Sequence, residues 1–396
     1  MASALDFKQS AAVLKSIVDQ ATGRSNITAT DTASFTQLAN IALTLDYDQL
    51  ATGISRVLAR TIFSNRPYTS KFNGLMKSEI EWGNHVRKIN YCDSDPVDND
   101  AWKLTDGSSV DQYTVKKPKV LQTNFYGGDT FSDYVTRYDY QLKDALTGPD
   151  QWGAFFAGVM QNIDDQMEQR LESFERGAVA NFIGGHIESA GLSSNPFGSE
   201  SVVHLVTVYN DQTGKQLTSE TVKAPENYTD FTRWAFGYIQ TLAQWMSERT
   251  ALYHTSPTGY KISRHTPRNR LKAYLYAPEN NQIDSRVMTS FNEGFLKYVD
   301  HESVGFWQSI QSPDGINVKA SYLGLDGQIK TASTAKATSD IYGVLFDEEA
   351  IGVTLFNKRL YSTPMNARGG YINYWWHVTA RYWNDFTENG IVLLLD

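Results

Sequence analysis

The sequence contains one cysteine, Cys92, in 396 residues. A single thiol excludes an internal disulfide and any zinc site that needs several cysteine ligands. Cys92 has no basic residue closer in sequence than Lys88 to lower the pKa of its thiol, so we expect an inert side chain. No apolar run approaches the length of a membrane-spanning helix, and the first residues lack the basic head and apolar core of a secretory signal peptide.

Positive charge is also sparse. The chain has 36 Lys and Arg against 44 Asp and Glu, a net charge of −8, and no block of basic residues. Binding to nucleic acid by counterion release is therefore not expected. With charged residues at only 20%, the chain does not have the composition of a disordered protein. Aromatic residues are abundant at 13%, which suits large buried interfaces as well as a core.

Motifs that carry enzyme chemistry are absent from the sequence. There is no Gly-x-Ser-x-Gly elbow, no phosphate-binding loop and no His-Glu-x-x-His pair, and the seven histidines are widely spaced. The nearest approach to a site is Asp164, Glu168 and Glu172 on one face of a predicted helix. They lack the histidines of a di-metal bundle, so we interpret them as a solvated or inter-subunit face. We predict no catalytic, cofactor-binding or metal-binding residue, and no cofactor.

The clearest pattern in the sequence is a long amphipathic helix over residues 149–185. Apolar residues from Trp152 to Phe182 recur mostly three or four positions apart. Pro149 suits the first turn of this helix, and Gly184-Gly185 suits its end. A helix of about 36 residues would be roughly 54 Å long, about three times the usual length.

Residues 82–135 predict a long two-stranded hairpin with a polar tip. The segment has too few apolar residues for a core of its own and needs a partner surface. One limb is acidic and the other basic, which favours contacts between neighbouring subunits over nucleic-acid binding. The candidate inter-subunit contacts are Asp93, Asp95, Asp98, Asp100, Lys116, Lys117 and Lys119.

The other segments predict a mixed α+β fold. Residues 1–65 have helical patterns that cannot close a core by themselves. Residues 230–340 alternate strands and helices as a compact lobe, and residues 341–396 are rich in strands, with strict alternation from 371 to 383.

Residues 186–228 are interpreted as a β-rich insertion. Its valine-rich run at 202–208 predicts a strand, Asp211 to Gly214 a turn, and residues 216–222 a returning strand.

The order of these elements resembles the major capsid proteins of tailed bacteriophages, which have the Hong Kong 97 type fold. Residues 60–68, 83–88 and 117–126 are similar to the head proteins of small short-tailed phages, the phi-29-like group. The closing stretches 339–342 and 374–382 are similar to the same group.

This resemblance implies a role for each segment. These are an N-terminal arm (1–65), an extended loop (82–135), the spine helix of a peripheral domain (149–185), an axial domain (230–340) and the return strands of the peripheral domain (341–396).

It also implies a structural protein, not an enzyme, that self-assembles as hexamers and pentamers. The product would be an icosahedral or prolate head shell enclosing the double-stranded DNA genome. The implied partners are further copies of the chain, a portal protein at one vertex, scaffolding or decoration proteins, and DNA held non-specifically, with no membrane. The chain would be made in the host bacterial cytoplasm and located in the virion capsid.

Some shells of this fold are cross-linked through a loop lysine, an asparagine and a catalytic glutamate. Lys103 and Lys116 are loop lysines, but the three residues cannot be matched together, so we expect non-covalent closure. Two other interpretations remain. Abundant Trp and Tyr with scattered acids would suit a carbohydrate-active hydrolase, although the long helix, arm and hairpin argue against one. The interpretation as a secreted surface-layer protein is weakened, because the sequence shows no signal peptide.

Overall fold

The computed structural model divides the chain into two compact units. The described residues are 7–22, 34–35, 37–38, 70–77, 86–94, 100–111, 113, 115–125, 128–138, 149–190, 201–286 and 299–396. The first unit comprises residues 1–82, 128–174 and 354–381, and the second comprises residues 83–127, 175–353 and 382–396. Most of the predicted second helical pattern of the arm, over residues 35–62, lies outside the described residues.

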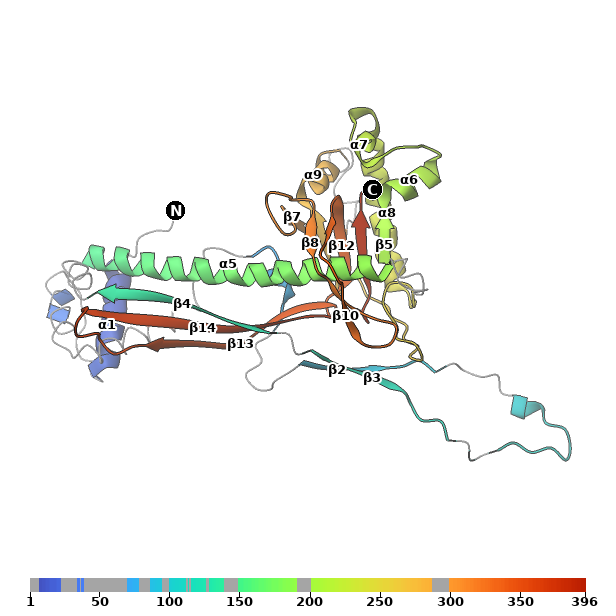
Figure 1. The fold of residues 1–396 in the computed structure, drawn as a ribbon, viewed down its shortest axis with the longest axis horizontal. Helices are drawn as coiled ribbons and strands as arrows, with labels where there is room; N and C mark the ends of the chain where they lie inside the picture. The colour runs from blue at the N-terminus through green and yellow to red at the C-terminus, as the bar shows by residue number, and fades with distance from the viewer. Residues whose placement is uncertain are drawn as a thin grey trace. The chain divides into compact units, whose positions relative to one another are not determined.

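The first unit contains a four-stranded sheet of order β1 (Met76–Lys77), β13 (Ile351–Ser362), β14 (Tyr371–Asn384) and β4 (Asp129–Tyr138). The predicted alternation of β14 is confirmed, because Tyr374, Trp376 and Val378 are buried between partly exposed neighbours. The N-terminal part of helix α5 (Pro149–Ala190) lies along this sheet (Figure 1). The Phe131 ring of β4 contacts Phe174 of α5, with 5.6 Å between ring centroids. Helices α1 (Phe7–Thr22) and η1 (Asn73–Leu75) also belong to this unit.

The second unit is built on a five-stranded sheet of order β5 (Val202–His204), β15 (Gly390–Leu394), β12 (Ile341–Asp347), β6 (Leu271–Tyr276) and β7 (Glu302–Val304). Every residue of β12 is buried, as expected for a central strand covered on both faces. Helices α6 (Leu205–Thr213), α7 (Ser219–Val222), α8 (Pro225–Ser247) and α9 (Ala277–Arg286) are grouped around the sheet (Figure 1). Apolar side chains of α8, such as Phe231 and Ile239, share one core with Leu345 of β12.

Three small two-stranded pairs complete the second unit. Strand β8 (Ile316–Val318) pairs with β11 (Lys336–Thr338), and β9 (Ser321–Leu323) pairs with β10 (Ile329–Thr331). The third pair is the hairpin of β2 (Val86–Tyr91) and β3 (Val120–Phe125), whose connection carries η2 (Asp100–Lys103). No helix in the described part of the chain is both long and apolar enough to cross a membrane.

The long helix is confirmed, but its predicted end is wrong. Helix α5 continues through Gly184 and Gly185 to Ala190. These glycines allow close packing inside the helix: a Cβ at Gly184 would lie 2.7 Å from a methyl of Val318. A Cβ at Gly185 would lie 2.5 Å from the Phe386 ring, which is closer than atoms can pack. The pair is therefore required by packing and does not end the helix.

The prediction of a β-rich insertion at 186–228 is also wrong. Within its described part only β5 is a strand, and α6, α7 and the first turn of α8 follow it. Leu205, Val206 and Tyr209 are spaced so that a helix buries all three in the core, and this burial outweighs the strand preference of valine. Gly214, in the left-handed conformation with φ 72°, ends α6.

The closing strands and the hairpin differ from their predicted boundaries. Only residues 354–381 of the segment 341–396 belong to the first unit, because β12 and β15 pair with β6 and β5 in the second. The hairpin pairing ends at Phe125, and the next strand, β4, pairs with β14 in a different sheet.

Candidate functional site

The described residues contain no group of three or more His, Cys, Asp or Glu side chains that could hold a metal ion. The buried His254 ring contacts the Asn389 side-chain oxygen at 3.1 Å and the Ile262 carbonyl at 2.8 Å, so both ring nitrogens have partners. Burial raises the pKa of the Cys92 thiol and Asp93 adds to this, although Lys119 and Arg264 oppose the shift. This direction agrees with the predicted inert thiol.

Glu168 and Glu172, which we predicted to form a solvated or inter-subunit face of α5, are not exposed to solvent. Glu168, Glu172 and Glu175 are all buried. Glu168 accepts a hydrogen bond from the backbone amide of Ser70 at 3.2 Å, so its own chain covers it. Helical periodicity places these acids on one face, but it does not reveal which segment packs there.

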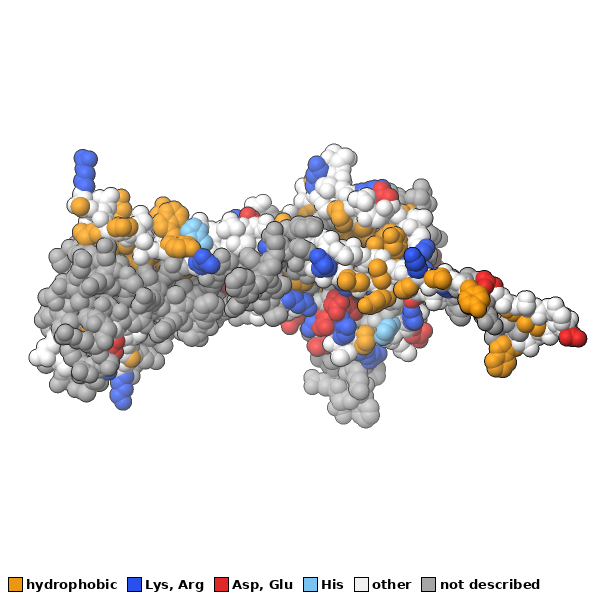
Figure 2. Space-filling model, turned by 90° about the horizontal axis from the view of Figure 1, so that it is seen from below, with side chains coloured by type: hydrophobic (Ala, Val, Ile, Leu, Met, Phe, Trp, Pro, Cys, Tyr) orange, Lys and Arg blue, Asp and Glu red, His pale blue; other side chains and the backbone are white. Residues whose placement is uncertain are grey.

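The hairpin carries large apolar side chains that the rest of its chain does not cover. Trp102 is 89% exposed, Tyr113 87%, Val115 79% and Tyr91 77%. Apolar groups are visible along the projecting hairpin in Figure 2. Large apolar side chains that are exposed together on one segment mark a surface that binds a partner. The hairpin is therefore the candidate functional element.

The two faces of strand β2 are inverted relative to an ordinary half-buried strand. Lys88 and the buried Asn90 face the body of the second unit, whereas Ile89 and Tyr91 face outward. On β3, Gln122 and Val120 lie opposite these two residues and are exposed like them. The polar face of the hairpin thus contacts the body of its own chain, and its apolar face is exposed.

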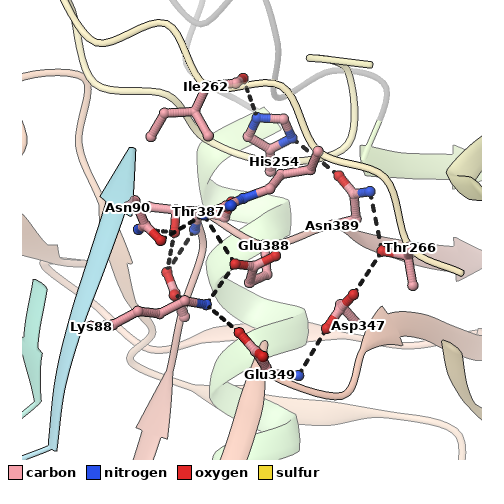
Figure 3. A network of polar contacts seen from close by, with 12 residues as sticks. Lys88, Asn90, His254, Ile262, Thr266, Asp347, Glu349, Thr387, Glu388 and Asn389 are labelled. Atoms are coloured by element: carbon pink, nitrogen blue, oxygen red, sulfur yellow. Dashed lines mark hydrogen bonds and ion pairs between the residues drawn. The ribbon is translucent and has the colours of Figure 1, made fainter. Parts of the chain in front are cut away.

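Lys88 lies among three carboxylates at the root of the hairpin (Figure 3). Its Nζ is 3.2 Å from Glu349 Oε2, 2.9 Å from Asp385 Oδ2 and 2.5 Å from Glu388 Oε1. Glu349 belongs to the turn between β12 and β13, and the other two belong to the turn between β14 and β15. A residue of β2 is thereby attached to two turns that lie far away in sequence.

Arg264 and Asn90 extend the network. Arg264 Nη2 is 3.0 Å from Glu388 Oε1 and donates to Asn90 Oδ1 at 2.7 Å. Its Nε donates to the Thr387 carbonyl at 3.0 Å. The Asn90 amide nitrogen donates to Thr387 Oγ1, also at 3.0 Å. The partly buried charges therefore have the hydrogen bonds that such groups require.

The charges of the root affect one another. Burial opposes the charge of Lys88, but Asp385 and Glu388 outweigh it and hold the Lys88 pKa above its usual value. Burial also raises the pKa of Glu388, against the attraction of Lys88 and Arg264. For the half-exposed Glu349, burial is outweighed by Lys88 and Arg270, and the pKa is lowered.

Of the predicted acidic contacts, Asp93 has its partners within its own chain. Asp93 forms an ion pair with Arg249, and its backbone amide donates to the Lys261 carbonyl at 2.7 Å. Partial burial opposes ionisation of Asp93, but Ser263 and Arg249 outweigh it and lower the pKa. Asp95 and Asp98 lie outside the described residues, and Asp100 starts η2.

The predicted basic contacts lie on the exposed limb of the hairpin. Lys119 Nζ reaches the Gly259 carbonyl at 3.5 Å. Lys116 and Lys117 are exposed, and neither has an ion pair or hydrogen bond to any residue that the structure describes. Lys103 ends η2 and is exposed as well.

Sequence reasoning missed Lys88, Arg264 and Glu388. One signal was present: in Lys88-Ile89-Asn90-Tyr91 the polar and apolar residues alternate with the period of a strand. This alternation shows that one face is polar, but it does not show that the polar face is the inner one.

Comparisons with known proteins agree with this architecture. A family model described as Phi29-like phage major capsid protein matches residues 14–394. A search of curated proteins finds no match. A capsid structure of Staphylococcus phage Andhra is similar with a TM-score of 0.54 and 11% identity, over 83% of this chain and 84% of that chain.

A chain from a structure of the head fibre and inner core protein gp22 of bacteriophage P68 is similar with a TM-score of 0.51 and 11% identity, over 83% of this chain and 85% of that chain. At this identity the two structures show the fold, which is the Hong Kong 97 type capsid fold. The family model covers nearly the whole chain. The chain therefore belongs to the family of Phi29-like phage major capsid proteins.

Proposed function

We propose that the hairpin of strands β2 and β3 is the element by which each copy of this capsid protein holds its neighbour in the head shell. The observation that supports this most is the exposure of Trp102, Tyr113 and Val115 on a projecting segment. Burying such side chains against another copy would stabilise the contact by about 25 cal/mol per Å² of apolar surface. A hairpin exposed to solvent does not gain this free energy. In a closed shell the same contact repeats at every equivalent position.

The basic limb adds charge to this contact surface. Lys116, Lys117 and Lys119 are exposed along the limb that leads into β3. An acidic surface on the neighbouring copy, including the predicted Asp95, Asp98 and Asp100, would attract them and fix the docking register. Each exposed pair contributes only about 0.2–1 kcal/mol, so the apolar contacts supply most of the affinity and the charges supply orientation.

The remaining segments have the roles that this fold implies. Residues 1–65 act as the N-terminal arm, and α5 is the spine helix of a peripheral domain that includes the sheet of β4, β13 and β14. The five-stranded sheet with α6 to α9 is the axial domain, where copies meet in hexamers and pentamers. The shell closes without covalent cross-links.

The partners follow from the shell role and the charge of the chain. A portal protein occupies one vertex, and scaffolding or decoration proteins assist the shell. The chain is made in the host bacterial cytoplasm. With a net charge of −8 the shell does not condense DNA, so the genome is held non-specifically after being driven inside.

Charge reversal on the basic limb tests the docking role. The triple variant Lys116→Glu, Lys117→Glu, Lys119→Glu should fold normally and give few closed shells by electron microscopy. Reversal of three exposed lysines outside the hairpin, Lys319, Lys330 and Lys336, is a control for the same change of net charge and should assemble better, although Lys330 and Lys336 have ion-pair partners in the chain. Normal shells from the hairpin variant would contradict the proposal.

The covalent state of the shell is tested separately. Boiled and reduced particles should run as one band near 44.5 kDa on a denaturing gel. A ladder of larger bands would contradict non-covalent closure and would indicate Lys103 or Lys116 as the cross-linking residue.

A further inference from the structure

The direction of the hairpin is not fixed by a larger sheet. Strands β2 and β3 pair only with each other in the part of the chain that the structure describes. Main-chain bonds from the hairpin to the body are few at the root, such as the one from the Asp93 amide to the Lys261 carbonyl. Side chains at the root must therefore determine how the hairpin leaves the body.

We propose that Lys88 is the positioning residue of the hairpin, and that its ammonium sets the direction and the rotation of β2 for assembly. The inference rests on the proposed role of the hairpin as the contact between copies. It adds a single residue, on the face of β2 opposite to the docking surface, on which correct docking depends.

The first argument is geometric. The three carboxylates that surround Lys88 Nζ come from two separate turns, at 2.5, 2.9 and 3.2 Å. An ammonium has three N–H donors, so one Lys88 side chain can be held from three directions. Contacts from both turns locate one point of β2 relative to the five-stranded sheet.

The second argument is that the two turns are themselves held in place. The Asp385 amide donates to the Ala350 carbonyl at 2.7 Å, which joins the two turns directly. Arg270 pairs with Glu349 at 2.5 Å, and the Thr387 amide donates to Asp385 Oδ1 at 2.9 Å. Asp385 and Glu388 are thus buried, fixed carboxylates, and the half-exposed Glu349 is held by Arg270.

The third argument concerns rotation of the strand. A slip of one residue moves every side chain of a strand to the opposite face. In β2 the slip that brings Ile89 against Asp385 and Glu388 would turn Lys88 outward, whereas the opposite slip would bring Arg87 there. Charged receptor groups reject an apolar side chain, so they oppose the first slip, and with Lys88 in place Ile89 and Tyr91 face outward, toward the neighbouring copy.

The test compares Lys88→Met with Lys88→Arg in the full chain. Met keeps most of the length of the side chain but removes its charge, which leaves Asp385 without a cation among the described residues, while Glu388 keeps Arg264 and Glu349 keeps Arg270. Arg supplies another cation at this position. We expect Lys88→Met to speed hydrogen exchange of the Asp93 amide at least tenfold and to replace uniform shells by irregular or open particles. Lys88→Arg should largely restore both the exchange rate and the shells.

Two further variants keep the test decisive. Arg87→Met removes a charge from the exposed face of the same strand and should leave Asp93 exchange unchanged. If Lys88→Met does not fold, the double variant Lys88→Met, Asp385→Asn takes its place, because it neutralises the carboxylate that pairs with Lys88 alone among the described residues. The cooperative unfolding of the body, followed by near-UV circular dichroism, shows that each variant is folded.

The outcomes separate this inference from the proposed function. Unchanged Asp93 exchange in Lys88→Met, or equal disruption by Met and Arg, would overturn the positioning role. Faster exchange with uniform shells would support positioning of the hairpin by Lys88 but would contradict the hairpin as the contact between copies.

Discussion

The body of the second unit and the hairpin that leaves it follow opposite rules of construction. In the body, apolar side chains face inward: every residue of β12 is buried. In β2, Lys88 and Asn90 face inward, while Ile89 and Tyr91 face outward. The body therefore completes its own core, whereas the apolar surface of the hairpin stays exposed. This difference predicts that changes in the body alter stability and that changes on the outer face of the hairpin alter assembly.

The largest difference that we expect between the two regions is in how their stability responds to acid. Burial lowers the pKa of His186, in the body beside Phe182, to about 3. A lowered histidine pKa stabilises the fold fully above the ordinary value near 6.5, and this contribution is lost as the pH falls toward 3. We expect the free energy of unfolding of the body to fall by several kcal/mol over that range, at up to about 1.4 kcal/mol per pH unit.

The histidine variants identify the group responsible. His186→Gln should flatten the dependence of unfolding free energy on pH, measured by urea titration, and His265→Gln at an exposed position should not. At the hairpin root the sign is the same but the pH window is lower, because Asp93 and Glu349 also have lowered pKa values. The stability that these two carboxylates contribute is complete above their ordinary pKa values near 4. It is lost as the pH falls below those values. An acid midpoint equal in all variants would contradict this assignment.

Glycines of α5 give the next largest effect. Gly185→Ala should destabilise the body by about 2–3 kcal/mol, because its Cβ would lie 2.5 Å from Phe386 and 3.2 Å from the Ser321 carbonyl. Gly177→Ala in the same helix meets no atom within 4 Å and should stabilise it by about 0.5–1 kcal/mol. Thermal unfolding of the two variants should shift in opposite directions, and shifts of equal sign would show that the helix packs differently.

The two faces of β2 give the smallest change in stability and the sharpest contrast. Asn90→Ala removes hydrogen bonds to Arg264 and Thr387 and should destabilise the second unit by about 1–2 kcal/mol. Tyr91→Ala, one residue away on the exposed face, should change the stability of the subunit by less than about 0.5 kcal/mol. It should nevertheless reduce the yield of closed shells. Equal loss of subunit stability in both variants would remove the contrast between the faces.

Local periodicity explains which parts of the fold could be predicted from the sequence. Apolar spacing identified α5 and β14, because a helix and a strand repeat with fixed periods. The same reasoning failed at Val202 to Val208, where β-branched residues suggested a strand and burial of Leu205 and Tyr209 produced α6. It also failed at Gly184-Gly185, because glycine marks a helix end and close packing equally well.

The root of the hairpin could not be predicted by such patterns. Lys88 and Glu388 are 300 residues apart in sequence, and no local signal joins them. The sequence did predict the hairpin itself, whose two strands pair in the structure; its need for a partner surface stays a prediction. It did not identify which of its charges are used within the chain, such as Asp93 with Arg249.

Hydrogen exchange at the outer part of the hairpin tests the account most directly. The amides of Trp102, Tyr113 and Val115 should exchange rapidly in the unassembled subunit, while those of β12 are protected. In the assembled shell the same hairpin amides should slow at least tenfold, because a neighbouring copy covers them. Exchange of these amides at the same rate in subunit and shell would contradict the claim that the hairpin joins the copies.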